Sequence, residues 1–129
     1  MASPQDLMQI GQKLVEYNNN DQSRKCVEEM YAQDCVSAEA AAMPGEDSNE
    51  VKGVDAIFAK HDWWESANEV HSSSAEGPFV HGDDRFCVIY EMDVTDKESG
   101  ERMQMREVAT YYVDSDNKIC REEFAYALG

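Results

Sequence analysis

Apolar side chains in the first half of the chain recur every three or four residues, which is the spacing of one face of a helix. The pattern predicts a helix over residues 6–17 and a shorter one that begins near Asp21. A third helix follows Gly53, where five side chains fall on one stripe: Val54, Ile57, Phe58, His61 and Trp64. Residues 34–39 separate the second helix from the third and are typical of a strand. The first half is therefore mainly helical.

The second half of the chain changes to a period of two, which is typical of strands with one buried face. Apolar and polar residues alternate over 86–94 and again over 103–111, and a short polar hairpin joins the two segments. An earlier strand is expected over 70–80 and a last one over 118–126. Helices followed by an antiparallel meander predict an α+β fold.

Length and charge narrow the class of protein. The 129 residues suit one domain over 1–129, and 42% hydrophobic residues are enough for a core. The 27 acidic and 11 basic side chains give a formal charge of −16. Because this charge repels phosphate backbones and anionic lipids, we expect no nucleic-acid and no membrane partner.

No apolar run approaches the ~20 residues that span a bilayer, and the first residues do not resemble a secretion signal. We therefore expect a cytoplasmic protein.

The cysteines and histidines do not predict a metal site. The four cysteines lack CxxC spacing, and each is flanked by apolar residues, as buried thiols are. The three histidines have neither HxH nor HxxxH spacing. We expect no disulfide, no metal and no cofactor.

Three segments of the chain carry a family resemblance: GVDAIFAKHDWW (53–64), GERMQMREVATYYV (100–113) and NKICREEFAYA (117–127). With the element order, they resemble the nuclear transport factor 2-like superfamily and, within it, the bacterial SnoaL-like branch. The resemblance implies a cone-shaped α+β barrel, in which three N-terminal helices pack in a strongly bent antiparallel sheet around a ligand-binding pocket. Members include steroid isomerases, polyketide cyclases, dehydratases and non-catalytic binding or assembly domains, so the fold leaves the function open.

The resemblance can be carried over residue by residue for one reaction. The general base of the ketosteroid isomerases falls on Glu39, so a carboxylate is kept. Their two oxyanion donors fall on Lys13 and Ala109, so both donors are lost. Each such donor supplies about 3 to 4 kcal/mol to transition-state stabilisation. We therefore expect no useful isomerisation of Δ5-3-ketosteroids.

The same alignment and the period of two select the side chains that face the pocket. The candidate ligand-binding residues are Trp64, Phe86, Tyr90, Met92, Met103, Met105, Tyr111, Phe124 and Tyr126. For Trp64 and the methionines, ordinary core packing is the alternative. The candidate catalytic residues are Glu39, His61, Glu107 and Glu122.

The candidate carboxylates are costly to bury without partners, so each is expected to be paired, protonated or near the pocket mouth. Glu107 and Glu122 are expected as neighbours on adjacent strands, with a tyrosine hydroxyl or His61 as the partner. His61 is either a proton carrier or a core histidine satisfied by a nearby acceptor. The acid and base candidates thus all depend on how the strands pair.

Three hypotheses for the function follow. The first is an acid/base enzyme, of isomerase, cyclase or dehydratase type, that acts on a small hydrophobic carbonyl compound. The second is a non-catalytic binder of a small hydrophobic ligand. The third is an interaction module whose cavity is filled by its own side chains. A homodimer is expected through the outward face of the sheet. The family resemblance is one reason. The other is that this face would otherwise expose a patch formed by Ile89, Val108, Thr110 and Tyr112.

Overall fold

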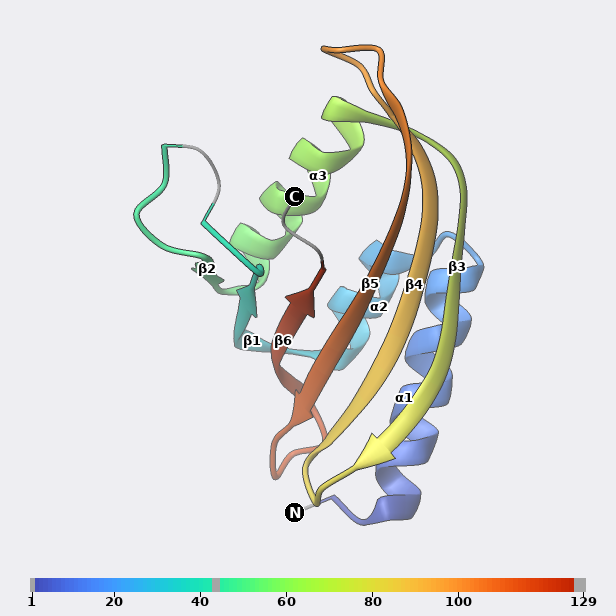
Figure 1. Cartoon of the computed structure of the whole chain (residues 1–129). Coiled ribbons are helices and arrows are strands. Elements are labelled where there is room, and N and C mark those ends of the chain that lie inside the picture. Colours follow the sequence, from blue (N-terminus) through green and yellow to red (C-terminus); the bar gives the residue numbers. More distant parts are fainter. Residues whose placement is uncertain (1, 43–44, 127–129) are drawn as a thin grey trace.

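The chain folds as three helices and six strands. The computed structural model describes residues 2–42 and 45–126. Along the chain, Figure 1 shows α1 (Pro4–Asn19), α2 (Ser23–Met30), β1 (Tyr31–Ala38), β2 (Glu50–Lys52), α3 (Val54–Ala67), β3 (Asn68–His81), β4 (Arg85–Asp96), β5 (Arg102–Val113) and β6 (Ile119–Ala125). The expected α+β order is confirmed. The sequence pattern missed β2, because a strand of three residues is too short to show a period.

The six strands form one open sheet in the order β2-β1-β6-β5-β4-β3. Strands β3 to β6 form the expected antiparallel meander. The expectation of a wholly antiparallel sheet is wrong at one place, because β1 runs parallel to β6. These two strands are far apart in the sequence, with α3 and four strands between them, so no hairpin forces them to run in opposite directions.

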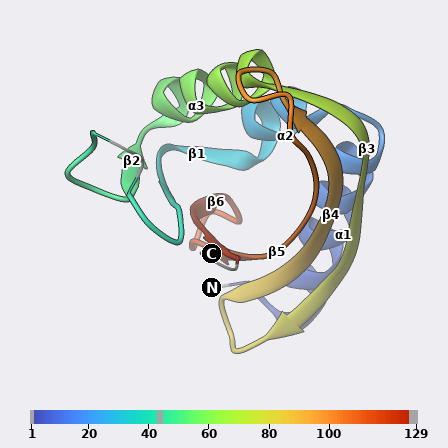
Figure 2. The same cartoon turned by 45° about the horizontal axis from the view of Figure 1, so that its top comes forward.

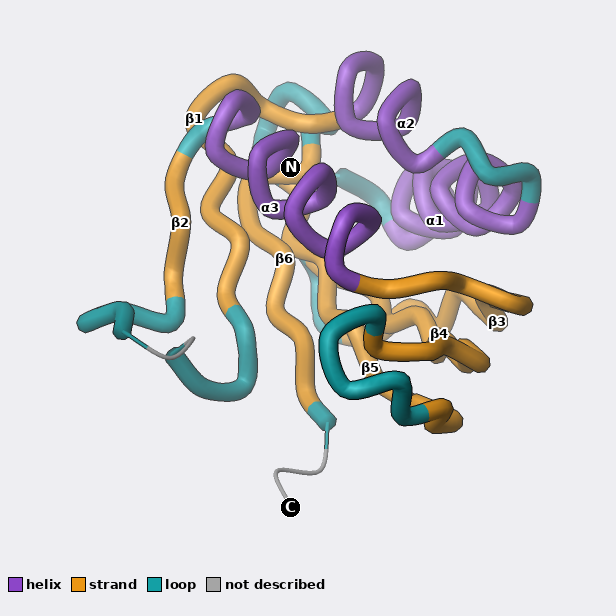
Figure 3. Tube along the Cα trace, turned by 90° about the horizontal axis from the view of Figure 1, so that it is seen from above, coloured by secondary structure: helices purple, strands orange, loops and turns teal. Residues whose placement is uncertain are grey.

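The sheet bends strongly, and the helices lie on its concave side. Figure 2 shows β3, β4 and β5 curving as one layer, with α3 across the open end of the curve. In the view from above, all three helices lie on one side of β3, β4 and β5 (Figure 3). None of the described helices has the length and apolar character needed to cross a bilayer. The cone-shaped α+β architecture is confirmed, with a mixed and unclosed sheet.

Side chains on the concave face of the sheet fall into cross-strand rows. From the closed end of the cone toward the β4–β5 hairpin, the rows are Phe86–Tyr111–Glu122, Val88–Ala109–Phe124, Tyr90–Glu107, Met92–Met105 and Val94–Met103. Phe86, Val88 and Ala109 have no exposed surface and form the core beneath the cavity. The rows therefore give the depth at which each inward side chain lies.

Helix α1 closes one side of the cone through a close approach to the sheet. A capping box begins the helix, because the Ser3 hydroxyl accepts from the Asp6 N–H and the Asp6 carboxylate accepts from the Ser3 N–H. One turn later, buried Gly11 lies against Pro78 of β3 and Phe86 of β4. A β-carbon at this position would lie 2.4 Å from the Pro78 Cβ and 3.2 Å from the Phe86 ring. Only glycine allows the helix to lie this close.

We expect Gly11→Ala to destabilise the protein by about 1–3 kcal/mol, because the new methyl group must displace Pro78 or the helix. In an exposed helix the same change stabilises by about 1 kcal/mol, so the sign of the effect is diagnostic. Urea unfolding of Gly11→Ala measures the change in stability. Gln12→Ala, at the exposed neighbouring position, is the control. A Gly11→Ala variant more stable than the parent would contradict the packing.

Candidate functional site

The concave face of the sheet and the helices enclose a cavity of about 1140 Å³. Helix α3, the start of α2 and strands β1 and β3–β6 all contribute to its wall. Most of the candidate residues line it: Glu39, His61, Trp64, Tyr90, Met92, Met105, Glu107, Tyr111, Glu122, Phe124 and Tyr126. All four candidate catalytic residues are thus in one cavity.

Two candidate ligand-binding residues, Phe86 and Met103, lie outside the cavity wall. Phe86 is fully buried at the closed end of the cone, with its ring stacked 5.3 Å from the Tyr111 ring. Met103 is 36% exposed and pairs with Val94 near the β4–β5 hairpin. Both have the expected inward parity, but one lies below the cavity and the other beyond it.

Lys60 is the cavity residue that the sequence analysis missed. Its ammonium group lies 2.5 Å from Oε1 of Glu39 and donates to the Ser37 hydroxyl at 2.7 Å. The Nζ atom also lies 5.1 Å from the centre of the Phe124 ring. Lys60 follows Ile57 by three residues and precedes Trp64 by four, so the helical period already placed it on the inward face.

Glu122 is the most deeply buried carboxylate of the site, with 1% of its surface exposed. Its two oxygens accept hydrogen bonds from the Tyr31 hydroxyl and, at 2.7 Å, from the Ser37 hydroxyl. The expected tyrosine partner is therefore present. Since Ser37 also accepts from Lys60, the hydroxyl connects the buried carboxylate to the cavity cation.

Glu107 lies two rows nearer the β4–β5 hairpin than Glu122 and pairs across the strands with Tyr90. The row that contains Ala109 and Phe124 separates it from Glu122, so the two glutamates are not cross-strand neighbours. Burial raises the pKa of Glu107 from its ordinary value of 4.5 to about 7, with a further increase from the negative charge of Glu39 and an opposing effect of Lys60. Glu107 can therefore both take up and release a proton near neutral pH.

His61 and Glu39 lie at the wall formed by α3 and β1. His61 is partly buried, and no described residue forms a hydrogen bond with it. Glu39 is paired through Lys60, and its other oxygen accepts from the Tyr126 hydroxyl at 3.2 Å. No cluster of three His, Cys, Asp or Glu side chains suited to a metal ion occurs within the described ranges 2–42 and 45–126.

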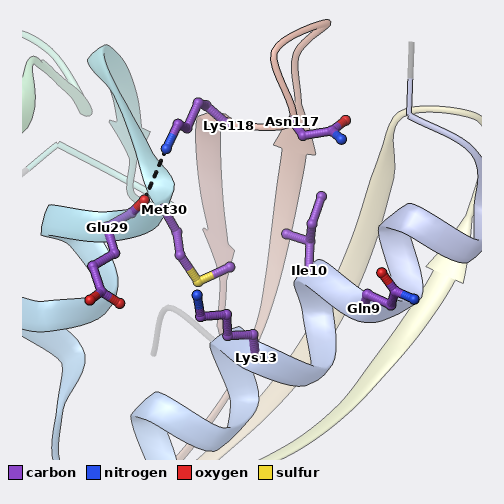
Figure 4. A pocket seen from close by; sticks show the side chains of 7 residues that line it. All are labelled: Gln9, Ile10, Lys13, Glu29, Met30, Asn117 and Lys118. Atoms are coloured by element: carbon purple, nitrogen blue, oxygen red, sulfur yellow. Dashed lines mark hydrogen bonds between the residues drawn. The ribbon is translucent and has the colours of Figure 1, made fainter.

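A second, smaller pocket of about 270 Å³ lies outside the cone, between α1, the end of α2 and the β5–β6 turn. Figure 4 shows Lys13 in this pocket, together with Lys118, which donates to the Glu29 carbonyl at 3.0 Å. Lys13 is therefore not part of the main cavity, and Ala109 offers only a buried methyl group. The family resemblance matches these two positions to the oxyanion donors of the ketosteroid isomerases. Neither position places a hydrogen-bond donor in the cavity of this protein.

The SnoaL-like domain model matches residues 6–126, nearly the whole chain. The protein belongs to the SnoaL-like domain family. A candidate SnoaL-like polyketide cyclase from Mesorhizobium loti is 36% identical, with a TM-score of 0.83 over 92% of this chain and 97% of that one. The comparison with curated proteins gave no match.

Two further solved structures share the fold at lower identity. A Mycobacterium tuberculosis protein in complex with estradiol-17β-hemisuccinate is 20% identical, with a TM-score of 0.65 over 98% of this chain and 96% of that one. The Δ5-3-ketosteroid isomerase from Mycobacterium sp. is 20% identical, with a TM-score of 0.68 over 98% and 95%. At this identity the likeness shows the fold alone.

Glu107 makes stability depend on pH. Because its pKa is raised to about 7, the folded protein keeps a proton that the unfolded chain releases from about pH 4.5 upward. Stability is therefore lost as the pH rises through this window, by up to about 3 kcal/mol above pH 7. We expect Glu107→Gln to be more stable than the parent at pH 8 and nearly equal to it at pH 4.5.

Urea unfolding at both pH values measures this difference. Glu101→Gln, in the exposed β4–β5 hairpin, controls for the loss of one negative charge. A stability difference for Glu107→Gln that is the same at both pH values would place its carboxylate in solvent.

Proposed function

We propose that this SnoaL-like protein binds a small hydrophobic carbonyl compound in its cavity and moves a proton on it, and that it does so in the cytoplasm. The observation that carries the proposal is the meeting of three groups in one largely apolar cavity. They are the ammonium of Lys60, its partner Glu39, and Glu107, whose pKa is raised to about 7. Such environments allow carboxylates to divide acid and base roles.

Lys60 supplies the electrostatic part of the proposed chemistry. An ammonium has three N–H donors, and two of those of Lys60 go to Glu39 and Ser37. The third is available to the oxygen of a bound carbonyl group. As a proton leaves the adjacent carbon, negative charge develops on that oxygen, and a fixed cation stabilises it.

Glu107 supplies the proton transfer. Its ionised carboxylate takes a proton from the carbon next to the carbonyl, and the electron pair of the broken C–H bond moves into an enolate. The carboxylic acid then returns the proton to the same carbon or to another atom of the enolate. Return of the proton to another carbon of the enolate is an isomerisation. In a cyclisation the enolate carbon attacks a second carbonyl of the substrate, and the proton goes to the new alkoxide. In a dehydration the C–O bond of a β-hydroxyl breaks, and this hydroxyl takes the proton and leaves as water.

The structural relatives support a small, hydrophobic ligand. One relative contains estradiol-17β-hemisuccinate, and another is a designed 17-OHP binder. The cavity of this chain, at about 1140 Å³, is large enough for a drug-sized hydrophobic molecule. A cavity this large also disfavours the alternative in which its own side chains fill the interior.

Proton exchange in D₂O tests the proposed chemistry. We expect native mass spectrometry of the freshly purified protein to show a retained small molecule, and NMR to show catalysed exchange of the α-protons of 2-tetralone. Glu107→Gln should lower the exchange rate at least 100-fold, since general-base catalysis contributes about 10²–10⁴-fold. Lys60→Met should lower it without abolishing binding, and Glu101→Gln should leave it unchanged.

Binding without exchange in the parent protein would overturn the enzymatic proposal and favour the non-catalytic binder. Exchange that survives in Glu107→Gln would overturn the role of that carboxylate.

A dimeric assembly is the second candidate function, and the convex face of the sheet favours it. Phe79 is 47% exposed and Val108 40% exposed, and both lie on this face beside Ile89. Arginines offset the acidic side chains around them, as in the pairs Arg106–Glu91 at 3.2 Å and Arg102–Asp93 at 2.8 Å. Although the chain carries a charge of −16, this face is nearly neutral, so two copies can meet here with little repulsion.

We expect the parent protein to sediment as a dimer at micromolar concentration and Val108→Glu to sediment as a monomer, because the new carboxylate loses its hydration at the contact. Met8→Glu, at a residue of α1 that is 38% exposed, is the matched control and should stay dimeric. A parent protein that sediments as a monomer at all concentrations would remove this candidate.

A further inference from the structure

Two tyrosine hydroxyls meet inside the cavity. Tyr90 of β4 and Tyr111 of β5 both line the cavity, and their hydroxyl oxygens are 2.6 Å apart. They belong to different rows of the concave face, and the row between them contains Val88 and Ala109. Because these two side chains are small, the longer phenols can lean over them and meet.

The hydrogens of this pair do not all have protein acceptors. A phenol has one O–H donor, so two phenols have two, and the bond between them uses one. No other hydrogen bond joins either hydroxyl to a described residue. Tyr111 is only 2% exposed, so its polar group has little access to bulk water. One O–H therefore remains to be satisfied from within the cavity.

The neighbouring carboxylates do not use this donor. Glu122 pairs with Tyr111 across the strands, but its oxygens accept from Tyr31 and Ser37. Burial raises the pKa of both Tyr90 and Tyr111, so the pair stays protonated and acts as a donor. The negative charge of Glu122 nearby disfavours a second anion at this place.

We infer that Tyr90 and Tyr111 form a ligand subsite that donates one hydrogen bond to an uncharged oxygen at the inner end of the ligand. The inference rests on the proposed function and narrows its substrate class. The ligand carries a carbonyl group at Lys60 and a second neutral oxygen, such as a ketone, ether or hydroxyl, that reaches the tyrosine pair. Carboxylate-bearing ligands are excluded from this end of the cavity.

Two probes of nearly equal shape test the subsite: 2-acetylnaphthalene with an acceptor oxygen, and 2-isopropenylnaphthalene, in which a CH₂ group replaces that oxygen. Titrations followed by tryptophan fluorescence give both dissociation constants, and the tyrosine variants are made in the Lys60→Met background, so that the ketone oxygen cannot bind at Lys60. We expect the parent protein to prefer the ketone about 5- to 10-fold, the range that one hydrogen bond gives. The preference should vanish in the double variant Tyr90→Phe/Tyr111→Phe.

The single variants separate a direct contact from a general loosening of the cavity. Changing the tyrosine that donates to the ligand to Phe should abolish the ketone preference. Changing the other tyrosine to Phe should leave most of the preference. Tyr112→Phe, whose hydroxyl donates to Glu123 at 3.0 Å on the convex face, is the matched control and should keep it in full. Lys60→Met should keep it as well.

Absence of a ketone preference in the parent protein, or its survival in the double variant, overturns the subsite. Loss of the preference in Lys60→Met also overturns it, because the oxygen then lies at Lys60. Proton exchange in 2-tetralone is a separate readout. The subsite can therefore fail while the proposed function stands, and exchange can fail while the preference remains.

Discussion

The buried carboxylate of Glu122 is the constraint on which the polar interior depends. A carboxylate with 1% exposure is costly to bury unless hydrogen bonds replace its hydration. Tyr31 and Ser37, at the two ends of β1, supply those bonds, so the carboxylate ties β1 to the parallel strand β6. Ser37 also holds Lys60, and α3 is thereby attached to the same centre. One buried group thus joins the parallel edge of the sheet to the position of the cavity cation.

The charged and the uncharged polar groups of the cavity lie on different parts of its wall. The wall formed by α3 and β1 carries the charged groups Lys60 and Glu39. The floor formed by β4 and β5 carries the uncharged hydroxyls of Tyr90 and Tyr111. Glu107 shares the row of Tyr90 on this floor, and its burial raises its pKa toward neutrality. A ligand that satisfies both polar regions must itself be mostly apolar between two oxygens.

Family membership determines the fold but not the reaction. The domain match and the Mesorhizobium loti relative establish the SnoaL-like fold over almost the whole chain. The family resemblance matches the two isomerase donors to Lys13, which lies outside the cavity, and to Ala109, which offers only a buried methyl group. The small side chain of Ala109 also leaves the space in which the tyrosine pair meets. The same fold can therefore stabilise an oxygen from a different part of its wall.

The sequence by itself determined the helices, the meander and the face on which each inward residue lies, because periods of 3.6 and 2 are local properties of the chain. It placed Glu107 and Tyr111 on the same face as Phe86 and Met103. Only the tertiary structure decided that the last two lie outside the cavity, since a period gives a face and not a depth.

The parallel pairing of β1 with β6 and the Lys60–Ser37–Glu122 connection also came only from the tertiary structure. They join residues that are distant in the sequence, and no local pattern encodes which distant groups will share a hydrogen bond. Burial by the whole fold, rather than any neighbour in sequence, likewise set the pKa of Glu107. The sequence therefore determined the faces, and three-dimensional packing decided which groups on them meet.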